Sequence, residues 1–209
     1  MKKLLVMCLL VSILFMMGFL KFERGFRNGY YYSETRPNIT LKIDKSLRYL
    51  GETDVLQGRL KSHAYMWLTP IPDGPGLEKM FIVEHSTVSQ ELANFTTAHL
   101  FRGMPSFANG RMDIGGESYQ YVFYITEPRG KNFWTDFITV KGFVLNKPKL
   151  TACFGKISTD TAWTKFYYMA SFDDTKYFKG ELTDADRALM NQFLENFRND
   201  IQYRGKYKK

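Results

Sequence analysis

Hydrophobic and polar residues alternate along most of the chain, with the period of two that is typical of a half-buried β-strand. The alternation is clearest over 118–126, where every second residue from Tyr119 onward is aromatic or aliphatic. Bulky residues occupy both parities of 134–145, which favours a central strand with a bulge at Gly142. The pattern predicts strands over 38–43, 45–50, 57–69, 78–86, 118–126, 134–145, 150–157 and 162–172.

Two segments instead repeat their apolar residues at three- and four-residue steps, as an amphipathic helix does. The first, 86–103, has Ser89 in an N-cap position and Gly103 where a helix would stop. The second, 184–202, begins at a capping-box pattern. That box pairs Thr183 with Asp186, and the apolar stripe behind it consists of Leu189, Met190, Phe193, Leu194, Phe197 and Ile201.

The order of these elements is strands, helix, strands, helix, and this order predicts the fold class. Prolines and glycines fill 70–76 between two strands, which predicts an antiparallel hairpin, and four glycines mark 103–117 as a loop. A parallel sheet would need strands and helices to alternate. We therefore predict an α+β fold: a mainly antiparallel sheet of about seven or eight strands, with one internal helix and a C-terminal amphipathic helix.

An uncharged apolar run of 17 residues, from Leu4 to Leu20, follows a dibasic start. As a helix it would be about 25 Å long, close to the lower limit for crossing a bilayer core of about 30 Å. Because the run lacks a pair of small residues for signal cleavage, we predict an uncleaved membrane segment. The alternative is a cleaved signal peptide, which would leave a secreted protein.

Either interpretation exports the remaining chain. We predict a cytoplasmic N-terminus, a linker over 21–37, and one globular domain over 38–209 in the periplasm or at the cell exterior. This part of the chain is long enough to build a core without disulfides. It contains a single cysteine, Cys153, which we interpret as a small buried hydrophobic residue rather than a nucleophile.

The formal net charge of +8 comes from the two ends of the chain. Between them, 31–196 carries 19 basic and 19 acidic residues, which argues against a nucleic-acid-binding surface. Basic residues beside a membrane segment attract anionic lipid. We predict lipid contact for Lys21, Arg24, Arg27, Lys206, Lys208 and Lys209, with a solvated C-terminal tail as the alternative for the last of them.

The candidate chemistry rests on three histidines. If the hairpin turns near Gly74, His63 and His85 face each other with β-carbons roughly 5 Å apart. Two imidazoles at this spacing could bind a transition metal, with His99 as a third ligand, or sense pH. A register shift of one residue would put the two side chains on opposite faces.

No phosphate-binding loop, dinucleotide fingerprint or hydrolase motif occurs, and the sequence therefore identifies no cofactor. We predict a membrane-tethered extracytoplasmic binding or assembly domain without catalytic activity. Its partners would be the membrane and an envelope protein or small ligand, and not nucleic acid. The alternative is an extracytoplasmic metal-binding protein, or metal-dependent enzyme, that uses the histidine pair.

Overall fold

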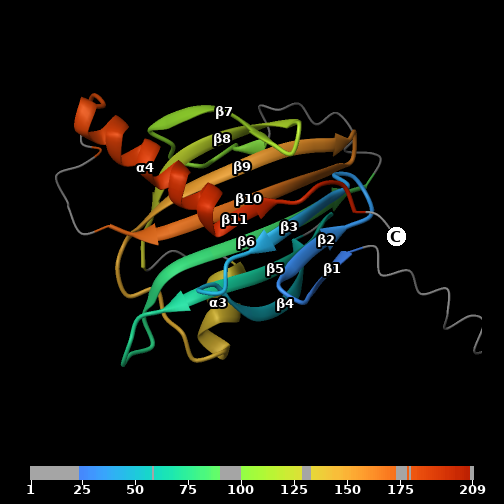
Figure 1. The fold of residues 1–209 in the computed structure, drawn as a ribbon, viewed down its shortest axis with the longest axis horizontal. Coiled ribbons are helices and arrows are strands. Elements are labelled where there is room, and N and C mark those ends of the chain that lie inside the picture. Colours follow the sequence, from blue (N-terminus) through green and yellow to red (C-terminus); the bar gives the residue numbers. More distant parts are fainter. Residues whose placement is uncertain are drawn as a thin grey trace, which may run out of the picture.

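The computed structural model describes residues 24–57, 59–89, 100–128, 133–172, 178 and 180–207, which form the strands and two helices of Figure 1. The strands are β1 (Arg24–Arg27), β2 (Tyr30–Ser33), β3 (Ile39–Ile43), β4 (Arg48–Gln57), β5 (Leu60–Pro70), β6 (Leu77–Val88), β7 (Ala108–Ile114), β8 (Glu117–Thr126), β9 (Lys149–Thr159), β10 (Ala162–Ser171) and β11 (Ile201–Tyr203). The helices are α3 (Phe133–Val140) and α4 (Asp184–Asp200).

Seven strands form one antiparallel sheet in the order β4-β5-β6-β10-β9-β8-β7. The other four form a smaller antiparallel sheet in the order β1-β2-β3-β11, in which the last strand of the chain pairs with β3. The α+β class and the antiparallel character are therefore confirmed, whereas the division into two sheets was not predicted.

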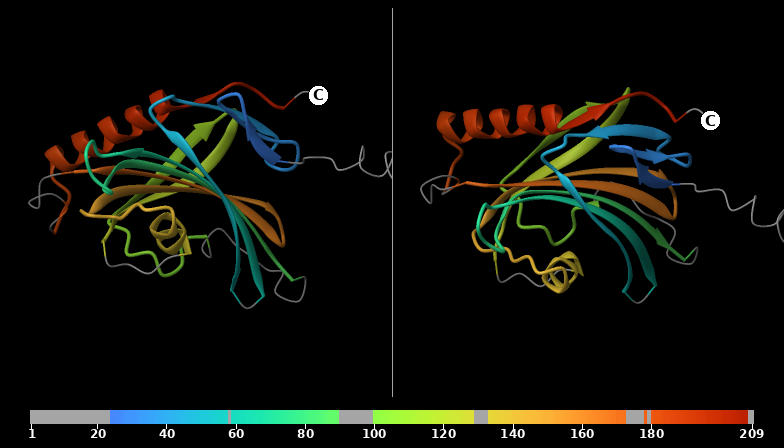
Figure 2. Two further views of the ribbon diagram at one scale, coloured as in Figure 1. Left: turned by 90° about the horizontal axis from the view of Figure 1, so that it is seen from below. Right: turned by 60° about the horizontal axis from the view of Figure 1, so that its bottom comes forward.

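The elements stack in layers on the seven-stranded sheet. Figure 2 shows α4 and the smaller sheet on one face and α3 on the opposite face. Each face therefore has its own hydrophobic layer, and the large sheet is buried from both sides.

Aromatic side chains dominate the layer under α4. Phe197 stacks on Phe154 of β9 with ring centroids 4.5 Å apart. Tyr31 of β2 meets the edge of Trp67 of β5 at 6.0 Å. Because aromatic rings bury large areas, these contacts hold both α4 and the smaller sheet on the large one.

A carboxylate at the end of α4 fixes the helix to the large sheet. Asp200 accepts hydrogen bonds from Lys79 Nζ at 2.9 Å and from the Tyr168 hydroxyl at 2.5 Å. Its backbone carbonyl accepts from the amide of Asp44. The chain then continues directly into β11, so that α4 ends two residues before the predicted 184–202 helix would, although its capping box is confirmed.

Residues 133–140 are helical, and the strand predicted over 134–145 was wrong. Trp134 and Ile138, four residues apart, point into the second hydrophobic layer. Gly142, with a φ of +85°, ends the helix in a Schellman motif: its amide donates to Thr139, and the next amide donates to Ile138. The glycine therefore stops a helix rather than marking a bulge.

Residues 24–33 form β1 and β2 and are not the linker expected over 21–37. Tyr31 is fully buried in the layer under the smaller sheet, and Phe26 packs on Trp67. The run of three tyrosines around position 31 alternates between the core and the surface of β2, which is why this segment folds as part of the body.

Two predicted segments lie partly or wholly outside the described residues. The helix expected over 86–103 overlaps the end of β6 at 86–88, and 90–99 are not described. The predicted membrane segment from Leu4 to Leu20 is also outside. Within the described ranges, neither helix has the length and apolar character needed to cross a bilayer.

Candidate functional site

The hairpin of β5 and β6 has the predicted register, and His63 lies directly opposite His85. The two side chains therefore start from one face of the sheet, but their surroundings differ. His85 is 5% exposed and lies beneath the smaller sheet, whereas His63 is about one-third exposed.

His85 is held between two hydroxyl groups. Its Nε2 is hydrogen-bonded to the Tyr31 hydroxyl, and its Nδ1 lies 2.9 Å from Thr164 Oγ1. Burial lowers the pKa of His85 well below its usual value, and the charges of Arg24 and His63 lower it further. A neutral ring, with one nitrogen donating and the other accepting, suits these two partners. His85 thus links β6 and β10 to the smaller sheet.

His63 pairs instead with carboxylates of the edge strand β4. Its Nδ1 lies 2.6 Å from Asp54 and its Nε2 3.2 Å from Glu52. Both ring nitrogens of both histidines are thus already hydrogen-bonded within the protein. No group of three or more potential metal ligands occurs among the described residues, and His99 lies outside them. The three-histidine metal site stays a prediction that metal analysis of untagged protein tests.

The opposite face of β5 and β6 holds a buried polar cluster around Glu84. The carboxylate accepts from the hydroxyls of Ser62 at 3.0 Å, Ser86 at 2.8 Å and Tyr167 at 2.6 Å. All four residues are less than 7% exposed. We interpret the cluster as structural, because a buried carboxylate is tolerated when hydroxyl donors surround it. Cys153 is also fully buried, and burial raises the pKa of its thiol to about 12.

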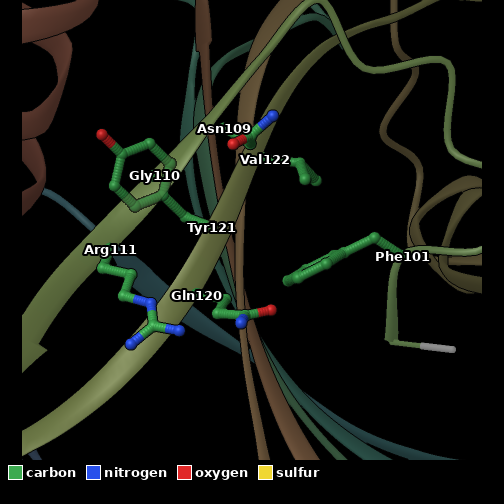
Figure 3. A pocket seen from close by; sticks show the side chains of 7 residues that line it. All are labelled: Phe101, Asn109, Gly110, Arg111, Gln120, Tyr121 and Val122. Carbon is green, nitrogen blue, oxygen red and sulfur yellow. The ribbon is translucent and has the colours of Figure 1, made fainter. Parts of the chain in front are cut away.

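A cavity of about 490 Å³ opens beside the edge strand β7 and its neighbour β8. Its lining includes Asn109 and Arg111 of β7 and Gln120 and Val122 of β8, with Phe101 forming a wall. Figure 3 shows the Arg111 guanidinium extending toward the Gln120 amide, with the Phe101 ring facing that amide from the other side. The cavity thus combines one cation, two amides and an aromatic ring.

Strand pairing and two glycines shape this cavity. Arg111 is paired with Gln120, which places both side chains on one face of the sheet. Gln120 is paired in turn with Gly155 of β9. A Cβ at Gly155 would come within 3.0 Å of the Phe101 ring, and the glycine therefore leaves the space in which that ring lies. On the other face, the Tyr121 hydroxyl covers Gly110.

Sequence reasoning missed this cavity because the glycines of 103–117 indicated a loop. The signal was nevertheless present, since Asn109, Arg111 and Asp113 alternate with residues of the opposite face of β7. What brings Phe101 over Gly155 is tertiary packing, which the linear pattern does not contain.

The predicted lipid-contact residues have several environments. Arg27 is exposed, whereas Arg24 is half-buried, and its Nε is buried without a hydrogen-bond partner among the described residues. Lys206 belongs to a segment hydrogen-bonded to β3 and is not part of a free tail. The remaining three, Lys21, Lys208 and Lys209, lie outside the described residues.

Comparison with known proteins identifies no relative. No protein-family profile matches the chain, and neither a curated protein nor a solved structure matches it significantly.

Proposed function

We propose that this chain is a membrane-tethered, extracytoplasmic binding domain whose ligand site is the cavity beside β7 and β8. The observation that carries the proposal is that Arg111, Gln120 and Asn109 line one cavity together, with the Phe101 ring as a wall. Pockets of 300–1,000 Å³ in which a few polar groups converge on apolar walls are the usual form of a ligand site.

The side chains of the cavity favour a polar ligand that carries a carboxylate. A guanidinium binds a carboxylate through two parallel hydrogen bonds. The amides of Asn109 and Gln120 each offer donors and an acceptor, which suits neighbouring hydroxyl groups. The Phe101 ring offers an apolar face for the C–H groups of a sugar ring. An acidic saccharide combines all three features.

The same composition favours binding over catalysis. A guanidinium and two amides supply charge and hydrogen bonds rather than a proton-transferring group. Among the described residues that line the cavity, none is a carboxylate, a histidine or a cysteine that could serve as a general base or nucleophile.

The apolar run from Leu4 to Leu20 supports the membrane tether. The neutral balance of charges over 31–196 is consistent with a domain that does not bind nucleic acid.

Protease added outside spheroplasts should digest the domain, because the proposal places it outside the cytoplasmic membrane. Full protection of the chain until the cells are lysed would contradict the proposed location.

Trigalacturonate is a suitable probe, with neutral maltotriose as its control. Titration calorimetry of the full-length chain in a maltoside detergent should detect binding of trigalacturonate and weaker or no binding of maltotriose. The substitution R111Q should weaken trigalacturonate binding at least tenfold, because it removes a charge-assisted pair worth about 1.5–3 kcal/mol. Arg187, exposed on α4, provides a charge-matched control in R187Q. Equal affinity in wild type and R111Q would exclude this cavity as the site.

A further inference from the structure

A second cavity, of about 470 Å³, lies where the C-terminal segment crosses the end of the large sheet. Four separate parts of the chain contribute charged side chains to its lining. These are Arg36 from the β2–β3 connection, Glu117 from the start of β8, Lys156 from β9, and Lys206 from the residues that follow β11.

The C-terminal segment holds Lys206 in its place at the cavity. On one side, the carbonyl of Gly205 accepts from the Thr40 amide at 2.9 Å. On the other side, the Tyr207 amide donates to Asn38 Oδ1 at 2.6 Å. Lys206 lies between these two hydrogen bonds. They fix its backbone to β3 and to Asn38, which precedes that strand.

The charges of the cavity are unbalanced. Glu117 forms an ion pair with Lys156, whose hydrogen bond and charge lower the pKa of the Glu117 carboxyl. Lys206 and Arg36 lie close enough to lower that pKa further. In the described part of the chain, neither Arg36 nor Lys206 forms an ion pair of its own. One carboxylate therefore faces three cations.

The lining also offers a neutral hydrogen-bond group. Ser158 of β9 borders the cavity, and its Oγ is buried without a partner in the described part of the chain. A buried hydroxyl without a partner costs free energy, and a bound acceptor would remove that cost. The cavity thus presents a guanidinium, two ammonium groups and a hydroxyl from different directions.

We propose that this cavity binds a phosphate group. A phosphate offers several acceptor oxygens at once, which suits donors that converge from separate elements better than a planar carboxylate does. A phospholipid headgroup and a soluble phosphorylated compound both carry this group.

The cavity lies toward the end of the molecule where β1 and the segment after β11 come together. Tyr207 stacks on Tyr32 with ring centroids 4.9 Å apart, and Tyr32 is paired with Gly25 of β1. Figure 1 shows β1, where the described chain begins, and the C-terminus at the same end. A segment that enters the membrane before β1 would bring this end near the bilayer surface. The phosphate site itself does not depend on that tether or on the β7–β8 cavity.

The test is thermal unfolding of the full-length chain in a maltoside detergent, with ionic strength held constant by chloride. The three probes are inorganic phosphate, dihexanoylphosphatidylglycerol and zwitterionic dihexanoylphosphatidylcholine. We expect the melting temperature to rise with at least one of the first two probes, because a ligand that binds only the folded state stabilises it. Stabilisation by inorganic phosphate assigns a soluble source, and stabilisation by phosphatidylglycerol alone assigns a lipid headgroup.

Three substitutions locate the binding. R36Q and K206Q should each weaken it by about tenfold, because each removes a charge-assisted hydrogen bond. Their melting temperatures without ligand should stay near that of wild type, because neither residue has an ion-pair partner among the described residues. E117Q should tighten binding, because it removes the one repulsive charge and frees Lys156.

The substitution R187Q, which removes one exposed charge on α4, is the matched control and should change nothing. Absence of stabilisation by both inorganic phosphate and phosphatidylglycerol would overturn the proposal. So would stabilisation that survives in both R36Q and K206Q, or binding that E117Q weakens. Each of these results leaves the R111Q experiment on the other cavity unaffected, so that the two proposals fail separately.

Discussion

Replacing Phe197 by alanine should lower the free energy of unfolding by about 3–5 kcal/mol. Phe197 is 2% exposed and lies at the centre of the aromatic layer, in contact with Phe154, Phe81 and Tyr168. The truncation removes these contacts and leaves a cavity that the flat rings of the sheet cannot fill. Urea unfolding of the full-length chain, followed by tryptophan fluorescence, measures the change.

The neighbouring substitution N196A is the control for F197A. Asn196 lies on the exposed face of the same helix, and its loss should change stability by no more than about 0.5 kcal/mol. If F197A cost as little as N196A, α4 would not be held to the large sheet by its apolar stripe, and the layered fold would be wrong at this point.

Acid should destabilise the protein through His85. Its folded-state pKa is depressed, so that the unfolded chain takes up a proton below about pH 6.5 while the folded chain does not. The stabilising contribution of the neutral ring is therefore complete above that pH and is lost as the pH falls. The loss grows as the pH falls below the unfolded-state pKa, with a slope of at most about 1.4 kcal/mol per pH unit for this one group.

The substitution H85Q separates this effect from general acid sensitivity. H85Q should be less stable than wild type at pH 7.5, because the bonds to Tyr31 and Thr164 are disturbed. The gap should shrink as the pH falls from 7.5 to 5.5, by at most about 1.4 kcal/mol per pH unit, because glutamine does not titrate. The control is H63Q, which leaves His85 buried and removes only the smallest of the three causes that lower its pKa, so that most of the pH dependence should remain. A gap that stays constant with pH would show that His85 is not buried in its neutral form.

Regular patterns were sufficient to predict much of the fold. The alternation over 57–69 and 78–86, with a proline-rich turn between them, gave the register that pairs His63 with His85. The capping box at Thr183 correctly placed the start of α4. In these segments local preference and tertiary packing agree, and the linear pattern is then enough.

The pattern failed where a short element depends on its neighbours. The eight residues of α3 include many aromatic and β-branched side chains, a composition that is typical of a strand. Packing on the second hydrophobic layer selects the helix instead. The segment 24–33 looked like a linker because two strands of four residues show too little periodicity. Its folding depends on Tyr31 reaching Trp67 and His85, which are remote in the sequence.

The candidate sites were less predictable than the fold. The histidine pairing followed from one hairpin, but the partners of each ring came from β2, β4 and β10. Phe101 reaches its cavity by packing over Gly155 of β9, and Lys206 reaches the other cavity from the far end of the chain. Such constellations depend on strand order in the sheets, which the spacing of residues along the chain does not determine.

The pairing of β11 with β3 also affects how the chain folds during its synthesis. α4 and β11 follow, along the chain, all the strands that they cover, and until they dock the aromatic surface beneath α4 has no cover. At that stage the chain exposes a large apolar surface, and such surfaces promote aggregation. Chaperones that bind exposed apolar surface would therefore matter most until α4 and β11 have docked.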